Sequence, residues 1–333
     1  MSIKIAINGF GRIGRMVARV IFDTKDVELV AINDPAGIDI SMQLLKYDSI
    51  HKAFRYEIKN KTDDSVEINN KKIKFYNFTD PNKLDFAKDN ADVVLECSGL
   101  FLTAKEVSHH IKKGVKKVII SAPANDDTPT FVLGVNEKNY KSQNIISNAS
   151  CTTNCLAPIA KIMDEVFGIE KGLMTTVHSY TNDQNVLDSK HEKDTRRARA
   201  SAINIIPTTT GAAKAVYKVL PSMEGKLHGQ SLRVPVPDVS MMDLNLVLKR
   251  NTTQKEVIEL LNKASQNELN GIILIDKDKR VSSDFYGCPY SSVIAEDLIQ
   301  VIGGNLVKIM AWYDNECGYS NRLVDMVKYI SKF

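Results

Sequence analysis

The chain has 333 residues, enough for about two domains of ordinary size. Hydrophobic residues make up 43% and charged residues 25% of it, a balance that allows a buried core beneath a polar surface. With 44 basic and 40 acidic residues, the net charge of +4 is too small to indicate a dedicated nucleic-acid or membrane binder. No apolar run approaches the roughly 20 residues that cross a bilayer. The first residues lead directly into a strand pattern, so we expect no secretory signal.

Cysteine usage indicates a reducing compartment. The chain has five cysteines, an odd number, and no Cys-x-x-Cys pair. This pattern argues against a disulfide framework and against a structural zinc site. We therefore expect a cytoplasmic protein that holds no metal.

The first half of the chain alternates between strand and helix patterns. The expected strands span 3–8, 27–33, 91–97 and 117–121, and the expected helices span 12–22 and 103–112. A hairpin is expected at 65–75, with its turn at Asn69-Asn70. Short apolar strands separated by helices predict a parallel sheet with helices on both faces. The first half is therefore predicted to be an α/β domain.

The pattern changes after about residue 150. A helix that contains Pro158 precedes a long polar segment at 180–204, whose length is typical of functional or disordered loops. The other expected elements are strands at 173–179, 232–236 and 239–248 and helices at 211–219, 254–267 and 318–330. Together they predict an α+β domain with a mainly antiparallel sheet.

Residues 8–14 read Asn-Gly-Phe-Gly-Arg-Ile-Gly and match the Gly-x-Gly-x-x-Gly pattern of dinucleotide-binding proteins. The match gains weight because it follows a strand, opens a helix and precedes Asp34, 20 residues after Gly14. Gly9 permits a tight turn, Gly11 lets the backbone approach a pyrophosphate, and Gly14 lets helix and strand pack closely. The helix N-terminus offers N–H groups to the phosphates.

Asp34 bears on the choice of cofactor. Its carboxylate can accept hydrogen bonds from the adenosine ribose and would repel a 2′-phosphate, which favours NAD over NADP. The alternative is an ordinary turn residue before Pro35. The spacing from the glycines favours the cofactor role.

Cys151 lies in the segment Ser-Cys-Thr-Thr-Asn-Cys at 150–155, just before an apolar, helix-like stretch. A cysteine at a helix N-terminus has its thiolate stabilised by the helix dipole, so we expect a pKa below the free value of about 8.5. His178, at the end of the next strand, is a candidate ion-pair partner and base. Spacing alone does not show that they meet, and composition alone favours a buried thiol and a core histidine. The other cysteines are interpreted as structural.

An ordered series of segments carries a specific family signature. They are INGFGRIGR at 7–15, LLKYDS at 44–49, ISAP at 120–123, SNASCTTNCLAP at 147–158, TVHSYTNDQ at 176–184, RRARA at 196–200, NIIPTTTGAAKAV at 204–216, RVPVPDVS at 233–240 and WYDNECGYS at 312–320. Over nearly its whole length the chain thus resembles the phosphorylating glyceraldehyde-3-phosphate dehydrogenases.

The resemblance implies a fold and a reaction. The fold is a Rossmann-type dinucleotide-binding domain with a doubly wound sheet at 1–149, a catalytic domain at 150–316, and a C-terminal helix at 317–333 that packs back on the first domain. The reaction, in glycolysis and gluconeogenesis, converts glyceraldehyde 3-phosphate and inorganic phosphate to 1,3-bisphosphoglycerate in a homotetramer. Cys151 would attack the aldehyde, and His178 would accept the hydroxyl proton as hydride leaves for NAD. Phosphate would then attack the thioester, and the Cys151 N–H would stabilise the oxyanion.

The resemblance also assigns binding residues, and hydroxyl and guanidinium groups suit phosphate. The attacking phosphate would contact Ser150, Thr152, Thr210, Gly211 and Arg233. The substrate phosphate would contact Thr181 and Arg197, with Arg233 serving both sites. The cofactor would contact Gly9, Gly11, Arg12, Ile13, Gly14 and Asp34, with Ser121 near the nicotinamide ribose, Asn315 orienting the carboxamide and Tyr319 walling the nicotinamide.

Three departures from the family pattern bear on the site. Cys317 stands where a tryptophan is usual, which removes an aromatic contact. Thr79 stands where many members carry an arginine near the adenine. Ser189 and Lys190 replace a Leu-Pro pair of NAD-specific members and would accept a 2′-phosphate that Asp34 resists. We therefore expect NAD preference with some tolerance of NADP.

Two alternatives stay open at this point. The sister enzyme that oxidises erythrose 4-phosphate without adding phosphate shares the cysteine, the histidine and the fold. A binding protein that uses the basic run at 196–199 for RNA or a surface receptor is the second alternative. We expect nucleic acid only in a secondary role.

Overall fold

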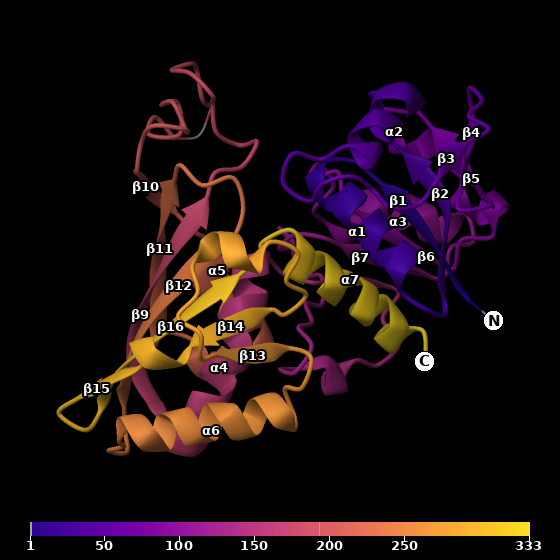
Figure 1. Ribbon diagram of the computed structural model, residues 1–333. Coiled ribbons are helices and arrows are strands. Elements are labelled where there is room, and N and C mark those ends of the chain that lie inside the picture. Colours follow the sequence, from indigo (N-terminus) through magenta and orange to yellow (C-terminus); the bar gives the residue numbers. More distant parts are fainter. Residues whose placement is uncertain (1, 193) are drawn as a thin grey trace. The chain divides into compact units, whose positions relative to one another are not determined.

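The computed structural model describes residues 2–192 and 194–333, and these form two compact units. The first unit comprises Met1–Phe131, Lys138–Ala149 and Ser320–Phe333, and the second comprises Val132–Glu137 and Ser150–Tyr319. In Figure 1 the first unit is indigo to purple apart from its yellow C-terminal helix, and the second runs from magenta to yellow. Each unit has its own eight-stranded sheet.

The sheet of the first unit has the strand order β3-β4-β5-β2-β1-β6-β7-β8. Its strands are β1 (Ile3–Asn8), β2 (Val27–Asn33), β3 (Ile58–Lys59), β4 (Ser65–Ile68), β5 (Lys71–Tyr76), β6 (Val93–Glu96), β7 (Lys117–Ile120) and β8 (Ile145–Ser147). From β5 to β8 all neighbours are parallel, whereas β3 and β4 add an antiparallel edge. The chain winds outward from β1 in both directions, which confirms the predicted doubly wound sheet.

Helices cover both faces of this parallel sheet. They are α1 (Arg12–Asp23), α2 (Ile38–Lys46), α3 (Ala104–Lys112) and α7 (Cys317–Ile330), whose first three residues belong to the second unit. Successive residues of β1, from Ile5 to Ile7, are fully buried. Because successive side chains point to opposite faces, both faces must be covered. α1 packs against β2, and α3 against β7 and β8.

The predicted hairpin is formed by β4 and β5. Ser65 pairs with Lys74 and Ile68 with Lys71 in antiparallel register. Asn69 and Asn70 form the turn with φ angles of 50° and 61°. Two successive residues at positive φ are typical of the tight turn whose twist matches a two-stranded ribbon, and asparagine tolerates this conformation.

The second unit is built on a mixed sheet of order β10-β11-β9-β12-β16-β14-β13, with β15 paired to β16. Its strands are β9 (Ile169–Ser179), β10 (Ile206–Thr209), β11 (Leu227–Val234), β12 (Ser240–Leu248), β13 (Ile273–Asp276), β14 (Ser292–Ala295), β15 (Gln300–Ile302) and β16 (Leu306–Tyr313). Among the described strands of this unit, only the pairs β9–β11 and β13–β14 are parallel. The predicted α+β unit with a mainly antiparallel sheet is therefore confirmed.

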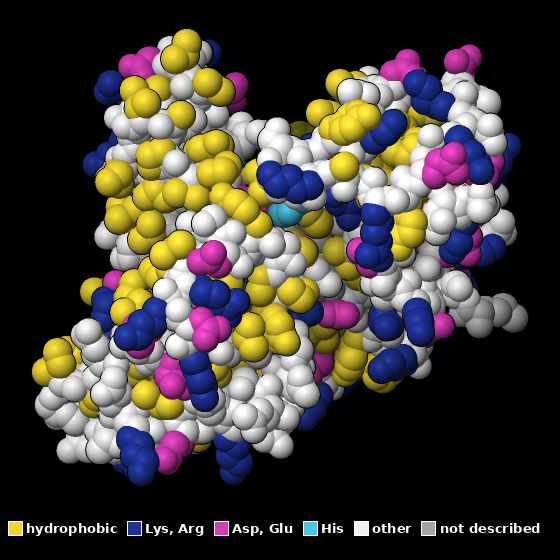
Figure 2. Space-filling model, in the orientation of Figure 1, with side chains coloured by type: hydrophobic (Ala, Val, Ile, Leu, Met, Phe, Trp, Pro, Cys, Tyr) yellow, Lys and Arg dark blue, Asp and Glu magenta, His cyan; other side chains and the backbone are white. Residues whose placement is uncertain are grey.

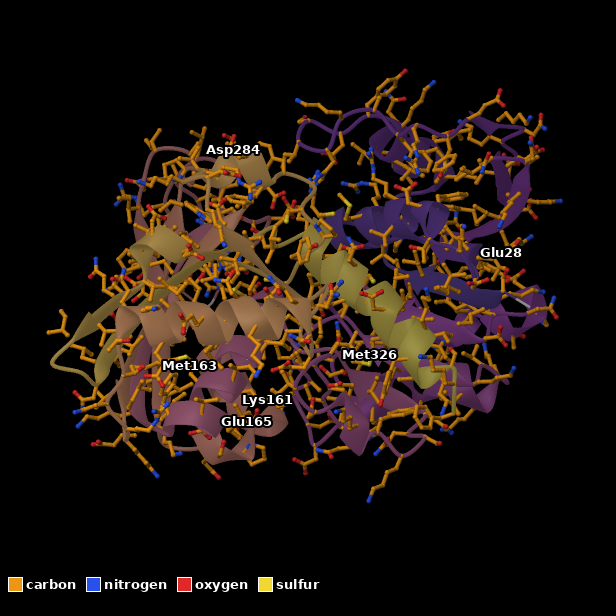
Figure 3. The ribbon with its side chains drawn as sticks, turned by 60° about the horizontal axis from the view of Figure 1, so that its bottom comes forward. Glu28, Lys161, Met163, Glu165, Asp284 and Met326 are labelled. Carbon is orange, nitrogen blue, oxygen red and sulfur yellow. The ribbon has the colours of Figure 1, made fainter. Side chains whose placement is uncertain are left out.

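The described α-helices that lie entirely in this second unit are α4 (Cys151–Phe167), α5 (Ala212–Val219) and α6 (Gln254–Gln266). α4 packs against β9, β12, β14 and β16. It is buried over most of its length and reaches the surface near its end, where Glu165 is exposed while Met163 is fully buried; both are marked in Figure 3. In the described part of the chain, no helix combines the length and the apolar character that spanning a membrane requires.

Candidate active site

The start of α4 fixes the position of Cys151. Ser150 is the N-cap residue, with extended backbone, and its Oγ accepts a hydrogen bond from the Thr153 N–H at 3.1 Å. This cap satisfies one of the N–H groups that a helix start leaves unpaired, which explains why the helix begins here. The N–H groups of Cys151 and Thr152 face the Cys151 sulfur and favour its thiolate. The side chain of Cys151 is half-buried.

His178 lies on β9 and faces this thiol. Its Nε2 is 3.7 Å from Cys151 Sγ, within hydrogen-bonding distance for sulfur. The sequence left open whether these two residues meet, because 27 residues separate them. The packing of α4 on β9 brings them together.

The other ring nitrogen of His178 determines which proton Nε2 can accept. His178 Nδ1 lies 2.7 Å from the Ser179 carbonyl oxygen and 2.6 Å from Arg233 NH1, which itself donates to Ser179 O at 3.0 Å. The Ser179 carbonyl oxygen favours the tautomer with its proton on Nδ1, which leaves Nε2 free to accept the thiol proton, whereas Arg233 NH1 can only donate and favours an Nδ1 without a proton. Arg233 and His178 are opposite each other in the register of β11 and β9.

Burial dominates the electrostatics of this pair. It raises the pKa of the Cys151 thiol, against the opposing effects of Thr152, Arg233 and the helix-start N–H groups. Burial, followed by the charge of Arg233, lowers the pKa of His178 to about 3. The thiol pKa is therefore shifted in the direction opposite to the expected one, because burial outweighs the helix start.

Arg233 keeps hydrogen-bonding capacity for an anion. Its Nε is buried and has no hydrogen-bond partner among the described residues. A buried donor without a partner is costly, and an anion would satisfy it. Thr210 and Gly211, predicted for the same phosphate, directly precede α5. Thr210 Oγ1 accepts from the Ala212 N–H at 3.1 Å, and Gly211 is the N-cap. Within the described chain, no hydrogen bond joins them to Arg233.

Arg197 is already paired. Its Nε donates to Thr208 Oγ1 at 2.8 Å, and its NH1 forms an ion pair with Asp183. Arg197 and Asp183 are close enough to Arg233 to act on its pKa in opposite directions. Thr181, the other residue predicted for the substrate phosphate, opens a turn in which the Gln184 N–H donates to its carbonyl at 2.9 Å.

Two networks near the thiol were not anticipated from the sequence. Asn315 Oδ1 accepts hydrogen bonds from Ser179 Oγ at 2.9 Å and Ser240 Oγ at 2.8 Å, which fixes the orientation of its amide. Tyr313 joins Thr152 to Thr176 through its hydroxyl. These contacts connect residues that lie far apart in sequence, and no local pattern marks them. Tyr319, predicted beside the nicotinamide, is buried near the start of α7.

In the first unit, the glycine motif forms a tight turn before α1. Gly9 has a φ of 91°, and a Cβ there would lie 2.4 Å from the Ser98 nitrogen. A Cβ on Gly14 would lie 2.1 Å from the Gly9 carbonyl oxygen. Gly11 is the N-cap of α1 without a side-chain cap, and a Cβ there would have no neighbour within 4 Å. The open space at Gly11 lets an anion approach this helix start closely.

Asp34 and Arg12 make contacts of their own around this turn. The Asp34 carboxylate accepts from the Phe10 N–H at 2.8 Å and the Ala36 N–H at 2.9 Å. An ionised carboxylate can accept about four hydrogen bonds, so capacity for a ribose remains. Arg12 NH1 forms an ion pair with Asp48 at 2.6 Å. Sequence reasoning gave no sign of this acidic partner.

A small cavity lies at the carboxyl ends of β1, β2 and β6, where doubly wound folds bind nucleotides. Its lining comprises Asn8, Gly9, Asn33, Pro35, Phe78, Thr79, Pro81, Leu84, Ser98, Leu100 and Phe101. Thr79, one of the departures from the family pattern, is thus part of this wall. Ser121 follows β7 at the same edge of the sheet, and its N–H donates to Glu96 O at 3.0 Å. The helix start without a side-chain cap, the open space at Gly11 and the position of this cavity match the place where doubly wound folds bind a dinucleotide.

The basic run at 196–199 is largely neutralised. Besides the pairing of Arg197 with Asp183, Arg199 Nε lies 2.8 Å from Asp188. Ser189 and Lys190, the proposed determinants of NADP tolerance, are exposed in the same segment. Arginines paired in this way offer little free charge to a nucleic acid.

Comparison with known proteins supports one family. Residues 150–315 match the family model described as glyceraldehyde 3-phosphate dehydrogenase, C-terminal domain, and residues 3–104 match its NAD binding domain. Glyceraldehyde-3-phosphate dehydrogenase 1 of Bacillus subtilis is 48% identical over 334 aligned residues, covering 100% of this chain and 99% of that protein. The enzymes of Geobacillus stearothermophilus and, under the name glyceraldehyde-3-phosphate dehydrogenase B, Aspergillus oryzae are 48% and 46% identical, each covering 99% of both chains. The chain therefore belongs to the glyceraldehyde 3-phosphate dehydrogenase family.

Proposed function

We propose that this protein oxidises glyceraldehyde 3-phosphate, with inorganic phosphate, to 1,3-bisphosphoglycerate in glycolysis and gluconeogenesis. The observation that carries the proposal is the approach of Cys151 Sγ and His178 Nε2 to 3.7 Å beside the guanidinium of Arg233. A thiol, a base and an anion-binding group are what acyl-phosphate formation through a thioester requires.

The residues act in sequence. His178 Nε2 takes the proton of the Cys151 thiol as the sulfur attacks the aldehyde carbon, and the helix-start N–H groups stabilise the oxyanion. His178 returns the proton to that oxygen, which gives a thiohemiacetal. It accepts the same proton again as the carbon is oxidised to the thioester. Phosphate held by Arg233, with Ser150, Thr152, Thr210 and Gly211, then displaces the sulfur, while Thr181 and Arg197 hold the substrate phosphate.

NAD is the cofactor of this reaction. When bound, it accepts the hydride from the thiohemiacetal carbon. The turn at Gly9, the uncapped start of α1 at Gly11 and the cavity beside Asn8 support its binding in the first unit. Asp34 opposes a 2′-phosphate, so NADP would serve only as a secondary cofactor. The proposed cofactor-binding residues are Gly9, Gly11 and Asp34 together with Arg12, Ile13, Gly14, Ser121, Asn315 and Tyr319.

The test is a turnover assay with and without phosphate. NAD and NADP reduction would be followed by absorbance with glyceraldehyde 3-phosphate, on wild type and on Cys151→Ser. We expect NAD reduction that depends on phosphate and is lost in the variant. Turnover of erythrose 4-phosphate without phosphate would move the assignment to the sister enzyme, and an inactive wild type would contradict the proposal.

We further propose a homotetramer. The second unit exposes apolar side chains in and beside the long polar segment, among them Val186, Leu187, Ile203 and Ile205, which are 76%, 75%, 80% and 66% exposed. Figure 2 shows hydrophobic side chains gathered over β9, β10 and β11. Exposed apolar groups of this density are typical of a subunit interface. Sedimentation of wild type and of Leu187→Asp would test the assembly, and a wild-type monomer would refute it.

The domain roles and the location complete the proposal. Residues 1–149 would bind the dinucleotide, residues 150–316 would carry the chemistry, and residues 317–333 would form the returning C-terminal helix. All five cysteines are free thiols in the described chain, which supports a reducing, cytoplasmic location. Proteolytic release of each part followed by NAD titration would test the division. Binding confined to the second part would contradict it.

A further inference from the structure

Three buried hydroxyl groups form a continuous chain behind Cys151. Tyr313 Oη lies 2.8 Å from Thr152 Oγ1 and 2.7 Å from Thr176 Oγ1. Thr152 Oγ1 lies in turn 3.9 Å from Cys151 Sγ. Tyr313, Thr152 and Thr176 are 1%, 4% and 1% exposed, so solvent does not compete for these bonds.

The chain is built from three elements of one unit. Thr152 lies in the first turn of α4, Thr176 is two residues before His178 on β9, and Tyr313 ends β16. The Tyr313 ring also meets the His178 ring edge-on, with centroids 5.9 Å apart at 75°. One buried tyrosine thus contacts both the neighbour of the thiol and the proposed base.

A tyrosine hydroxyl has a single hydrogen, so Tyr313 donates to one threonine and accepts from the other. When sulfur carries its proton, the bonds run from the thiol to Thr152, then to Tyr313 and Thr176. When sulfur is a thiolate, every hydroxyl rotates and the bonds run the opposite way, ending on the anion. A hydrogen-bond chain that ends on a charge is strengthened along its length, so the second direction gains more.

We propose that Tyr313 and Thr176 are positioning residues that turn the Thr152 hydroxyl toward the Cys151 sulfur as the thiol ionises. The proposal rests on the proposed function only in taking Cys151 as the nucleophile. The thiol proton moves to His178 Nε2, and the hydroxyl hydrogens rotate without leaving their oxygens. The chain favours the thiolate without burying a further charge, which partly offsets the burial that opposes ionisation.

The rate at which iodoacetamide alkylates Cys151, measured against pH without substrate, tests the chain, because only the thiolate reacts. Tyr313→Phe should shift the profile to higher pH and slow alkylation about fivefold at neutral pH, the effect of losing one hydrogen bond between neutral groups. Thr176→Val should shift it in the same direction, and Thr176→Ser should restore the wild-type profile. Tyr140→Phe removes another buried hydroxyl, which donates to Gln143 O at 2.9 Å in the first unit, and should change nothing.

Profiles of Tyr313→Phe and Thr176→Val that superimpose on wild type would overturn the proposal. So would a Thr176→Ser profile that equals that of Thr176→Val, because the hydroxyl would then not matter. Thermal unfolding identifies any variant that does not fold. If Tyr313→Phe does not fold, the comparison of Thr176→Val with Thr176→Ser tests the proposal. Peptide mapping confirms that Cys151 is the alkylated residue. Since alkylation needs no substrate, its outcome is separate from that of the turnover assay.

Discussion

His110 in the first unit and His178 in the second make an instructive pair. They are 1% and 6% exposed, and burial lowers the pKa of each to about 3. Their partners differ. His178 has the Cys151 sulfur at one ring nitrogen and Ser179 O with Arg233 at the other.

His110 has no such partners. Neither of its ring nitrogens has a hydrogen-bond partner among the described residues. Its ring stacks on Phe86, with centroids 5.4 Å apart, and lies 3.8 Å from the ring of His109. A strongly perturbed pKa therefore does not identify a catalytic group by itself. The groups that surround the ring decide whether its proton can be used.

The largest expected effect is on the reaction itself. His178→Asn should lower kcat/KM by about 10²–10⁴-fold, the usual contribution of a general base, while leaving the unfolding temperature nearly unchanged. Turnover kinetics and thermal unfolding measure the two quantities. His110→Phe should retain wild-type kcat/KM. Equal losses of activity in both variants would erase the distinction drawn between the two rings.

Replacing Arg233 tests the role of the guanidinium that lies beside His178 Nδ1. Arg233→Gln should weaken phosphate binding by roughly ten- to hundredfold, because a buried charge-assisted donor is lost. Since Arg233 lowers the pKa of both Cys151 and His178, both should rise in the variant. The KM for phosphate and the pH profile of alkylation are the measurements. An unchanged KM for phosphate would remove Arg233 from the phosphate site.

The free energy of unfolding at acid pH should depend on His110. Because its folded pKa of about 3 lies below the ordinary value of 6.5, its contribution to stability is present above pH 6.5 and is lost as pH falls toward 3. Lys113 and the ring of His109 face it, and Asp80 acts on His109. His110→Phe should raise the free energy of unfolding at acid pH by about 1–3 kcal/mol.

Denaturant unfolding between pH 4 and 7 measures this contribution. His228→Gln, at an exposed histidine of β11, is the matched control and should follow wild type. An acid limb that is identical in His110→Phe and wild type would show that His110 does not limit stability there.

The smallest effect concerns the helix start beside the thiol. Ser150→Ala should cost about 1 kcal/mol of stability through the lost cap. Thr103→Ala, at the capped start of α3, should cost about the same. Only Ser150→Ala should also change the alkylation profile of Cys151. If Ser150→Ala and Thr103→Ala show the same alkylation profile, the Ser150 cap does not affect the reactivity of the Cys151 thiol.

The elements that flank the glycine motif were predictable because their signals are local. β1 and β2 have their predicted bounds, and α1 extends the predicted helix by one residue. Strands of the second unit were harder. β9 begins at Ile169, whereas the prediction began at 173. The first four residues were missed because the exposed Glu170 and Lys171 interrupt the apolar pattern of the strand.

Two further strands show how polar residues and prolines affect such predictions. β11 spans Leu227–Val234 rather than 232–236: polar residues hide its start, and the prolines that follow end it early. α2 at Ile38–Lys46 was missed, since its start lacks a side-chain cap.

In the site, too, features set by local sequence were predictable and features set by tertiary packing were not. The segment around Cys151 is recognisable, and its helix start is a local property. The shift of the thiol pKa is not recognisable in the same way, because the burial that raises this pKa depends on tertiary packing. Tyr313 is 161 residues from Thr152, and nothing in the sequence around either residue marks their contact.

The ion pair of Arg197 with Asp183 has a consequence for selectivity. An anion that binds to this arginine competes with a carboxylate already in place. A dianionic phosphate monoester carries enough charge to win that exchange, whereas an aldehyde without a phosphate leaves the pair closed. The Asp183 carboxylate would thus compete with the substrate phosphate for Arg197, so that only a strongly charged anion would bind there. In such a site, discrimination against unphosphorylated aldehydes depends on the exchange as much as on the arginine itself.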